Sequence, residues 1–349
     1  MFLLAMMGTL AAVGAFVALD GDGDDSDDNT EDTAANERVP DSTLEGSSLS
    51  DLLIGTDGHD LISLGDGDDR SEGGEGDDTI NGDAGADDLR GETGDDALYG
   101  DAGTDDLYGG DGDDFISGGA DADILEGGFG DDRMTGGGGL DVMVGGSGDD
   151  TMSGSLGQDY MSGDSGDDSL SGGYGSDGLH GGIGADTLDG GAGDDALNGG
   201  TLVTGPSLSS PITLRQVFLE NESTPSTFGL DVVDDGTADV LRGGDGNDVL
   251  LAGAGDDLTG GEGLDVFGIG DWMDAGEAAV IRDFNVGDDS IVYRYDGLTP
   301  PDLSYETVTN SDGSADVEIL VGGEVIAYLE NAGDGFDPAT HVQLLQANA

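Results

Sequence analysis

The chain has 349 residues, of which 35% are hydrophobic, 5% are aromatic and 70 are glycine, and this composition excludes an ordinary globular core. Its 78 acidic residues face only 8 basic ones, all arginine, and the net charge of −70 excludes nucleic acid as a partner. Cysteine is absent, which excludes disulfides and thiolate metal sites. Such a chain stays expanded unless cations bind at fixed places, and a hard divalent cation with oxygen ligands is the natural candidate.

The first nineteen residues, 1–19, are an uncharged run of apolar and small side chains. They predict a membrane anchor or a signal segment, and both place the rest of the chain outside the cytoplasm. No basic residue precedes the run, and it is longer than the usual apolar region of a signal peptide, which favours the anchor. Residues 20–54 are acidic and polar without a hydrophobic period, and they predict a solvated linker.

Residues 55–198 divide into sixteen consecutive nine-residue units without an insertion or deletion. The pattern is G-G-x-G-x-D-x-U-x, where U is aliphatic. A disordered acidic tail has no reason to keep a nine-residue phase. Position 6 is aspartate in every unit, and we predict that these aspartates are metal ligands: Asp60, Asp69, Asp78, Asp87, Asp96, Asp105, Asp114, Asp123, Asp132, Asp141, Asp150, Asp159, Asp168, Asp177, Asp186 and Asp195.

A second block of four units covers residues 234–268, one of them a residue short. Its predicted position 6 ligands are Asp239, Asp248, Asp257 and Asp265. Between the blocks, residues 199–233 contain three prolines and an apolar stretch around Val217, which predicts a loop excursion with one short structured element. In residues 269–349 the glycine content falls, and alternating or β-branched runs at 279–284, 290–295, 317–321 and 324–329 predict antiparallel strands. We expect this region to cap the open end of the array.

Each nine-residue unit combines a turn with a short strand. Glycines at positions 1, 2 and 4 allow positive φ, so the backbone can turn back and present carbonyl oxygens beside the position 6 carboxylate. In the strand, position 8 points inward and positions 7 and 9 point outward. Two units make one coil, whose two inward aliphatic side chains are too few to offset the conformational entropy of eighteen ordered residues. Bound cations must supply the remainder, so folding and binding are expected to be one event.

These units resemble the RTX, or haemolysin-type calcium-binding, repeats of Gram-negative bacterial proteins. The resemblance covers residues 55–198 and 234–268, and it implies a right-handed parallel β-roll that binds multiple calcium ions between successive turns. The segment 280–293, with its VIRDF and GDDSIVY sequences, is similar to the end of such arrays in proteins exported by type I secretion. That family usually lacks an N-terminal signal, so the apolar run is a departure from its pattern.

No catalytic motif accompanies the repeats, and we predict that the protein is not an enzyme. The histidines His59, His180 and His341 do not form H-E-x-x-H, no serine lies in G-x-S-x-G, and no aromatic-lined cleft for a sugar is evident. Ice binding would need a row of threonine at position 3, where only Thr93 is found. A non-catalytic secreted or cell-surface protein remains, either an adhesin or matrix component with an unknown protein or surface partner, or a calcium-dependent module that assists another protein's export.

Overall fold

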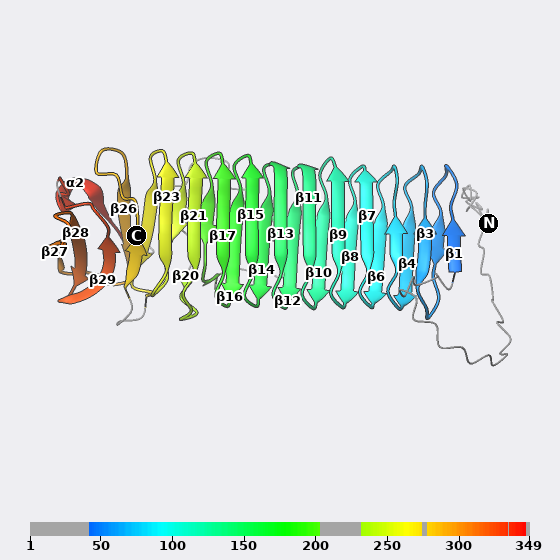
Figure 1. Ribbon diagram of the computed structural model, residues 1–349, viewed down its shortest axis with the longest axis horizontal. Helices are drawn as coiled ribbons and strands as arrows, with labels where there is room; N and C mark the ends of the chain where they lie inside the picture. The colour runs from blue at the N-terminus through cyan, green and yellow to red at the C-terminus, as the bar shows by residue number, and fades with distance from the viewer. Residues whose placement is uncertain (1–41, 203–231, 274–277, 334, 347–349) are drawn as a thin grey trace, which may run out of the picture.

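The computed structural model describes residues 42–202, 232–273, 278–333 and 335–346. These residues form a long parallel β-roll in which the chain passes alternately through two facing sheets (Figure 1). The first sheet has 15 strands, in the spatial order β1 (Ser42–Glu45), β3 (Asp60–Ser63), β5 (Thr79–Asn81), β7 (Ala97–Ala102), β9 (Phe115–Ala120), β11 (Arg133–Gly139), β13 (Thr151–Gly157), β15 (Ser169–Tyr174), β17 (Thr187–Ala192), β21 (Val240–Asp245), β23 (Asp257–Glu262), β25 (Ala279–Ile281), β29 (Glu324–Leu329), β28 (Ala315–Val321) and β27 (Leu303–Thr309).

The second sheet has 13 strands, in the order β2 (Leu52–Ile54), β4 (Arg70–Glu75), β6 (Asp88–Thr93), β8 (Asp106–Asp111), β10 (Ile124–Phe129), β12 (Val142–Ser147), β14 (Tyr160–Ser165), β16 (Gly178–Ile183), β18 (Ala196–Asn198), β22 (Val249–Leu251), β24 (Val266–Gly270), β26 (Ser290–Tyr295) and β30 (Val342–Gln346). A two-stranded antiparallel pair, β19 (Thr201–Leu202) and β20 (Val232–Val233), stands between the blocks. One short helix, α2 (Pro338–His341), precedes β30.

The nine-residue phase fixes the strand register. Within the first block each strand pairs in parallel with the strand of the next coil, eighteen residues on, so that Leu98 faces Ile116 and Met134 faces Met152. The position 8 side chains point between the sheets as predicted, and Leu98, Ile116 and Met143 are fully buried. The core is therefore two columns of aliphatic side chains, and the predicted parallel β-roll is confirmed.

The roll begins earlier than the repeat pattern predicts. β1 pairs in parallel with β3, and β2 with β4, so residues 42–54 form a coil of the roll and the predicted linker 20–54 is wrong over this part. Residues 46–54 keep the phase of the array, with Gly46 at position 1, Asp51 at position 6 and Leu53 at position 8. Loss of the other glycines hides this unit in the sequence.

The stack is also continuous across the interruption. β17 pairs in parallel with β21, placing Leu188 against Leu241 as if no residues intervened. The residues around Val217, for which a structured element is predicted, lie outside the described part of the chain.

The C-terminal region differs from its prediction in one respect. β25 and β26 are not antiparallel: they pair in parallel with β23 and β24 and continue the roll. Within this region antiparallel pairing joins only β27, β28 and β29, which form the predicted cap, and β29 attaches this cap to the roll by pairing in parallel with β25. β25 and β26 thus extend the array as further parallel strands, because the last strands of the array have unpaired backbone N–H and C=O groups along their open edges.

In the part of the chain that the structure describes, no helix is both long enough and apolar enough to cross a membrane. The predicted anchor or signal segment, residues 1–19, lies outside that part.

Candidate functional site

The position 6 aspartates form two continuous ladders, one along each edge of the roll. In each ladder the backbone N–H of one aspartate donates a hydrogen bond to Oδ1 of the aspartate one coil further on, as from Asp96 to Asp114 at 2.8 Å in one ladder and from Asp123 to Asp141 at 2.9 Å in the other. The side chains are buried, with Asp105 and Asp141 fully so. The repeat phase thus places every predicted ligand of the first block in one of two rows.

One ladder joins odd-numbered units of the array and the other joins even-numbered units, and both cross the interruption. The first contains Asp60, Asp78, Asp96, Asp114, Asp132, Asp150, Asp168, Asp186, Asp239 and Asp256. The second contains Asp51, Asp69, Asp87, Asp105, Asp123, Asp141, Asp159, Asp177, Asp195, Asp248, Asp265 and Asp289.

The assignment of Asp257 as a ligand is wrong. Asp256 is the buried aspartate that accepts the Asp239 N–H, at 3.0 Å, whereas Asp257 lies at the start of β23 and pairs with Arg282 at 2.6 Å. The short unit 252–259 lacks one loop residue, and Leu258 keeps the inward position opposite Leu241. Strand pairing therefore sets the register, and the missing residue shifts position 6 back by one.

Two further ladder residues escape the sequence pattern. Asp51 donates its N–H to Asp69 at 2.7 Å, and Asp289 accepts the N–H of Asp265 at 3.1 Å. Asp51 has the phase of the array and could be found by extending the count of nine towards the N-terminus. Asp289 lies twenty-four residues after Asp265, so nothing in the repeat spacing indicates it.

The second carboxylate oxygen of most ladder aspartates has no hydrogen-bond partner among the described residues, whereas Oδ2 of Asp60 and Oδ2 of Asp256 each accept a backbone N–H. Oδ2 is buried and unbonded at every position 6 from Asp69 to Asp195, and again at Asp248 and Asp265. A buried carboxylate oxygen without a hydrogen bond carries a large desolvation cost, which a bound cation would offset. Burial accordingly raises the pKa of Asp96 to about 7 and that of Asp123 to about 8, and neighbouring aspartates on adjacent coils add to the shift.

The position 1 glycines border the space into which Oδ2 points. At Gly109, a Cβ atom would meet Oδ2 of Asp114 and would lie 2.8 Å from the carbonyl oxygen of Gly127, one coil further on. At Gly91 and Gly100 the corresponding space is bordered in the same way, by the Oδ2 atom of that unit's position 6 aspartate and by a glycine carbonyl oxygen one coil further on. These units therefore each have a small cradle, empty of side chain, where an unbonded carboxylate oxygen and a backbone carbonyl oxygen come together.

The glycines of the loop have separate functions, and the prediction of positive φ at position 1 is wrong. Positive φ occurs at positions 2 and 4, as at Gly74 (124°) and Gly76 (119°). Glu92 and Ser155 occupy position 2 with φ of 80°, which shows that this turn tolerates a side chain. Position 1 instead favours glycine because a Cβ atom there would fill the cradle, and Leu64 is the one exception in the first block.

The donor set of the cradle fits calcium, which prefers carboxylate and carbonyl oxygens. No three acidic or histidine side chains converge on one point in the described residues, so backbone carbonyls would have to complete each coordination shell. The position 6 aspartates and the loop carbonyls are the groups that would hold the ions. Calcium would supply the positive counter-charge that is missing beside the buried carboxylates.

A family model for the RTX calcium-binding nonapeptide repeat matches the chain in overlapping segments that together cover residues 45–201, and again at 233–267. The chain belongs to this family. The matches include more than half of the sequence and coincide with the coils that carry the two ladders. RTX repeats are typical of secreted bacterial proteins. No curated protein matches the chain.

The two edges of the RTX roll differ at position 5, a feature that sequence reasoning missed. On one edge this position is Asp77, Asp95, Asp113, Asp131, Asp149 and Asp167 in successive coils. Their carboxylates form a second, exposed ladder, in which Asp131 Oδ1 accepts the N–H of Asp149 at 2.9 Å. On the other edge the same position is Ala86, Thr104, Ala122, Leu140, Gln158 and Ser176 in six successive coils, with Asp68 before them and Asp194 after them. We call these the acidic edge and the neutral edge.

Comparing position 5 in alternate units would have shown this difference, because alternate units lie on the same edge. Consecutive units lie on opposite edges, so a comparison of consecutive units mixes the two edges. Position 5 then varies without a pattern, and the ladder of its carboxylates on one edge is hidden.

Proposed function

We propose that this protein is a non-catalytic, calcium-folded component of the cell surface or the extracellular space, acting as an adhesin or matrix protein and exported by type I secretion. The unbonded Oδ2 atoms of the two ladders carry the proposal, because rows of buried carboxylates cannot stay ionised without bound cations. The family's association with secreted proteins supports the location.

Calcium concentration would then act as the signal for folding. Extracellular calcium modules bind with Kd on the order of 10⁻⁴ to 10⁻³ M, which is far above cytoplasmic calcium. In the cytoplasm the carboxylates repel one another and the chain stays expanded, which suits export. Outside the cell, ions enter the cradles and the coils stack on one another.

The experiment is a calcium titration of the full chain followed by circular dichroism, together with fractionation of the producing cells. We expect little β signal in chelator, a cooperative gain of β structure at about millimolar calcium, and protein at the cell surface or in the medium. Full β signal in chelator would contradict the coupling of folding to calcium. Protein confined to the cytoplasm would contradict the location.

A further inference from the structure

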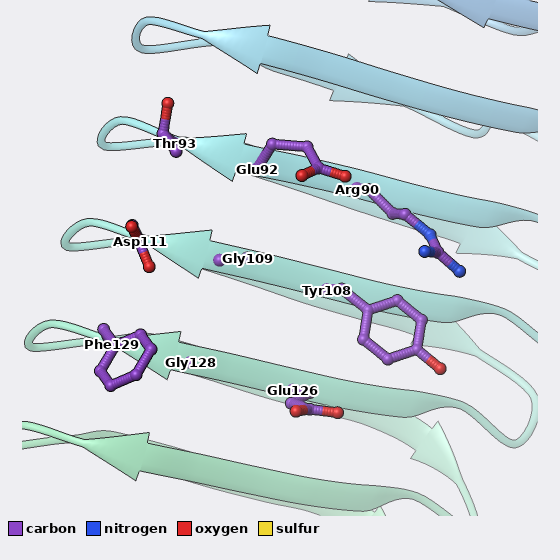
Figure 2. Close-up of a pocket in the computed structure, with 10 residues that line it drawn as sticks. Arg90, Glu92, Thr93, Tyr108, Gly109, Asp111, Glu126, Gly128 and Phe129 are labelled. Carbon is purple, nitrogen blue, oxygen red and sulfur yellow. The ribbon is translucent and has the colours of Figure 1, made fainter.

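A shallow hollow lies on the outer face of the second sheet, beside the glycine loops of the acidic edge, and has a volume of about 410 Å³ (Figure 2). It spans three neighbouring strands, β6, β8 and β10, which belong to three successive coils. Arg90, Tyr108 and Glu126 stand in register along one side, and Thr93, Asp111 and Phe129 stand in register along the other, near the strand ends.

The floor of the hollow is backbone. Between the two rows of side chains lie Gly110 and Gly128, which pair with each other and with Glu92 across the strands. Because these two glycines are neighbours on adjacent strands and have no side chains, they leave a trough in which a ligand can approach the main chain. Tyr108 and Phe129 stand on opposite sides of this trough, and Phe129 is 65% exposed although it is a large apolar ring.

Charged groups surround the two rings. The Arg90 guanidinium lies 5.2 Å from the centre of the Tyr108 ring and is held by Asp88, whose Oδ1 is 2.9 Å from Nε. Glu92, Asp111 and Glu126 supply carboxylate oxygens at the rim. Burial raises the pKa of the half-buried Glu126 carboxyl, with a further contribution from Asp164.

This composition selects the class of ligand by exclusion. Three carboxylates repel an anion, and no three acidic or histidine side chains among the described residues converge to hold a metal ion. An organic cation would meet Arg90, which already occupies the face of Tyr108. A neutral, polyhydroxylated molecule avoids all three conflicts, since its C–H faces pack on aromatic rings while its hydroxyls donate to carboxylates and accept from arginine.

We propose that this hollow is a binding site for a neutral saccharide, with the exposed Phe129 ring as the stacking platform, Tyr108 as the opposite wall, and Glu126 and Arg90 as hydrogen-bonding partners. Its volume falls within the usual range for small-ligand sites, about 300 to 1,000 Å³. The inference rests on the proposed function for its setting, because it gives a surface protein a ligand.

The test uses the calcium-loaded full chain and isothermal titration calorimetry. The probes are the neutral oligosaccharides mannohexaose, cellohexaose and chitohexaose, with dextran sulfate as the polyanion and spermine as the polycation. We expect at least one neutral probe to bind, and Tyr108→Ala and Phe129→Ala each to weaken its binding at least tenfold. Glu126→Gln, which keeps the side-chain volume, should also weaken it.

Tyr174→Ala is the matched control. Like Phe129, Tyr174 occupies position 3 of its unit and is largely exposed, at 68%. It lies on the neutral edge, outside the hollow, so its loss should leave saccharide binding unchanged. An unchanged calcium midpoint for every variant shows that the roll is intact. Binding of none of the neutral probes, binding of the charged probes alone, or an equal loss in Tyr174→Ala would overturn the proposal. Such failure with normal calcium-induced folding would leave the proposed function standing.

Discussion

The acidic and neutral edges of the roll are built from the same nine-residue unit. Their position 6 carboxylates are arranged alike, but their position 5 residues differ. Both edges have a buried position 6 ladder in which one carboxylate oxygen is bonded and the other is not. Only the acidic edge adds an exposed position 5 ladder. The difference separates the aspartates that the calcium sites require from those that merely cap exposed backbone N–H groups.

The largest expected effect concerns both edges at once and needs no mutation. Without metal, burial raises the pKa of Asp96 to about 7 and that of Asp150 to about 8, against an ordinary value of 3.8. A raised pKa in the folded state favours folding when the group is protonated, so this stability is fully present below about pH 4 and is lost progressively as the pH rises from about 4 to 8. In chelator, acidification from pH 8 to pH 4 should therefore increase the β signal in circular dichroism. A decrease would contradict the account.

The next effect separates adjacent residues of the acidic edge. Asp132→Ala removes a carboxylate that faces a cradle and accepts the Asp114 N–H, and it should raise the calcium midpoint of folding severalfold. Asp131→Ala removes only an exposed acceptor for Asp149, which water can replace, so its shift should be small. Asp141→Ala, on the neutral edge, should match Asp132→Ala. Calcium titrations in one buffer measure all three, and equal shifts in Asp131→Ala and Asp132→Ala would refute the distinction.

A smaller effect is expected from two glycines of one neutral-edge loop. In Gly136→Ala the new methyl group would lie 2.5 Å from Oδ2 of Asp141 and fill the cradle, so the calcium midpoint should rise. Gly138→Ala has nothing within 4 Å of the new atom, and by restricting the unfolded chain it should leave folding unchanged or slightly favoured. The same titration compares them, and a larger loss from Gly138→Ala would show that the cradle is misplaced.

The smallest effect is expected near the end of the roll, where fewer coils depend on each site. Asp256→Asn should weaken calcium-dependent folding of the last coils, whereas Asp257→Asn should only loosen an exposed pair with Arg282. Hydrogen exchange of the β23 amides at a fixed calcium concentration would detect this local change. If Asp257→Asn gave the greater loss of protection, the assignment of Asp256 to the ladder would fail.

Much of the fold could be predicted because the repeat is local. One unit determines a turn, a strand and an inward side chain, and repetition then fixes the parallel pairing of residues such as Leu98 and Ile116. The ladder positions of the first block follow from the same count. Where the count is perturbed, as at Asp256, pairing with the neighbouring strand decides the register, and that pairing is not visible in the sequence.

The ends of the roll were harder to predict for a related reason. β25 and β26 are parallel because the strand edges of β23 and β24 are available to them, not because of any feature of their own residues. The hollow around Tyr108 and Phe129 combines residues from different coils, and no local sequence motif predicts it. Prediction from the repeat therefore ends where contacts between coils, rather than the unit itself, determine the structure.

The central claim is that calcium ions lie beside the buried position 6 carboxylates on both edges. Anomalous X-ray diffraction from crystals grown in calcium would test it most directly. The account predicts two parallel rows of ions, one along each edge, each next to the Oδ2 atoms of aspartates such as Asp132 and Asp141. A single row, lying beside the exposed position 5 carboxylates of the acidic edge, would contradict it.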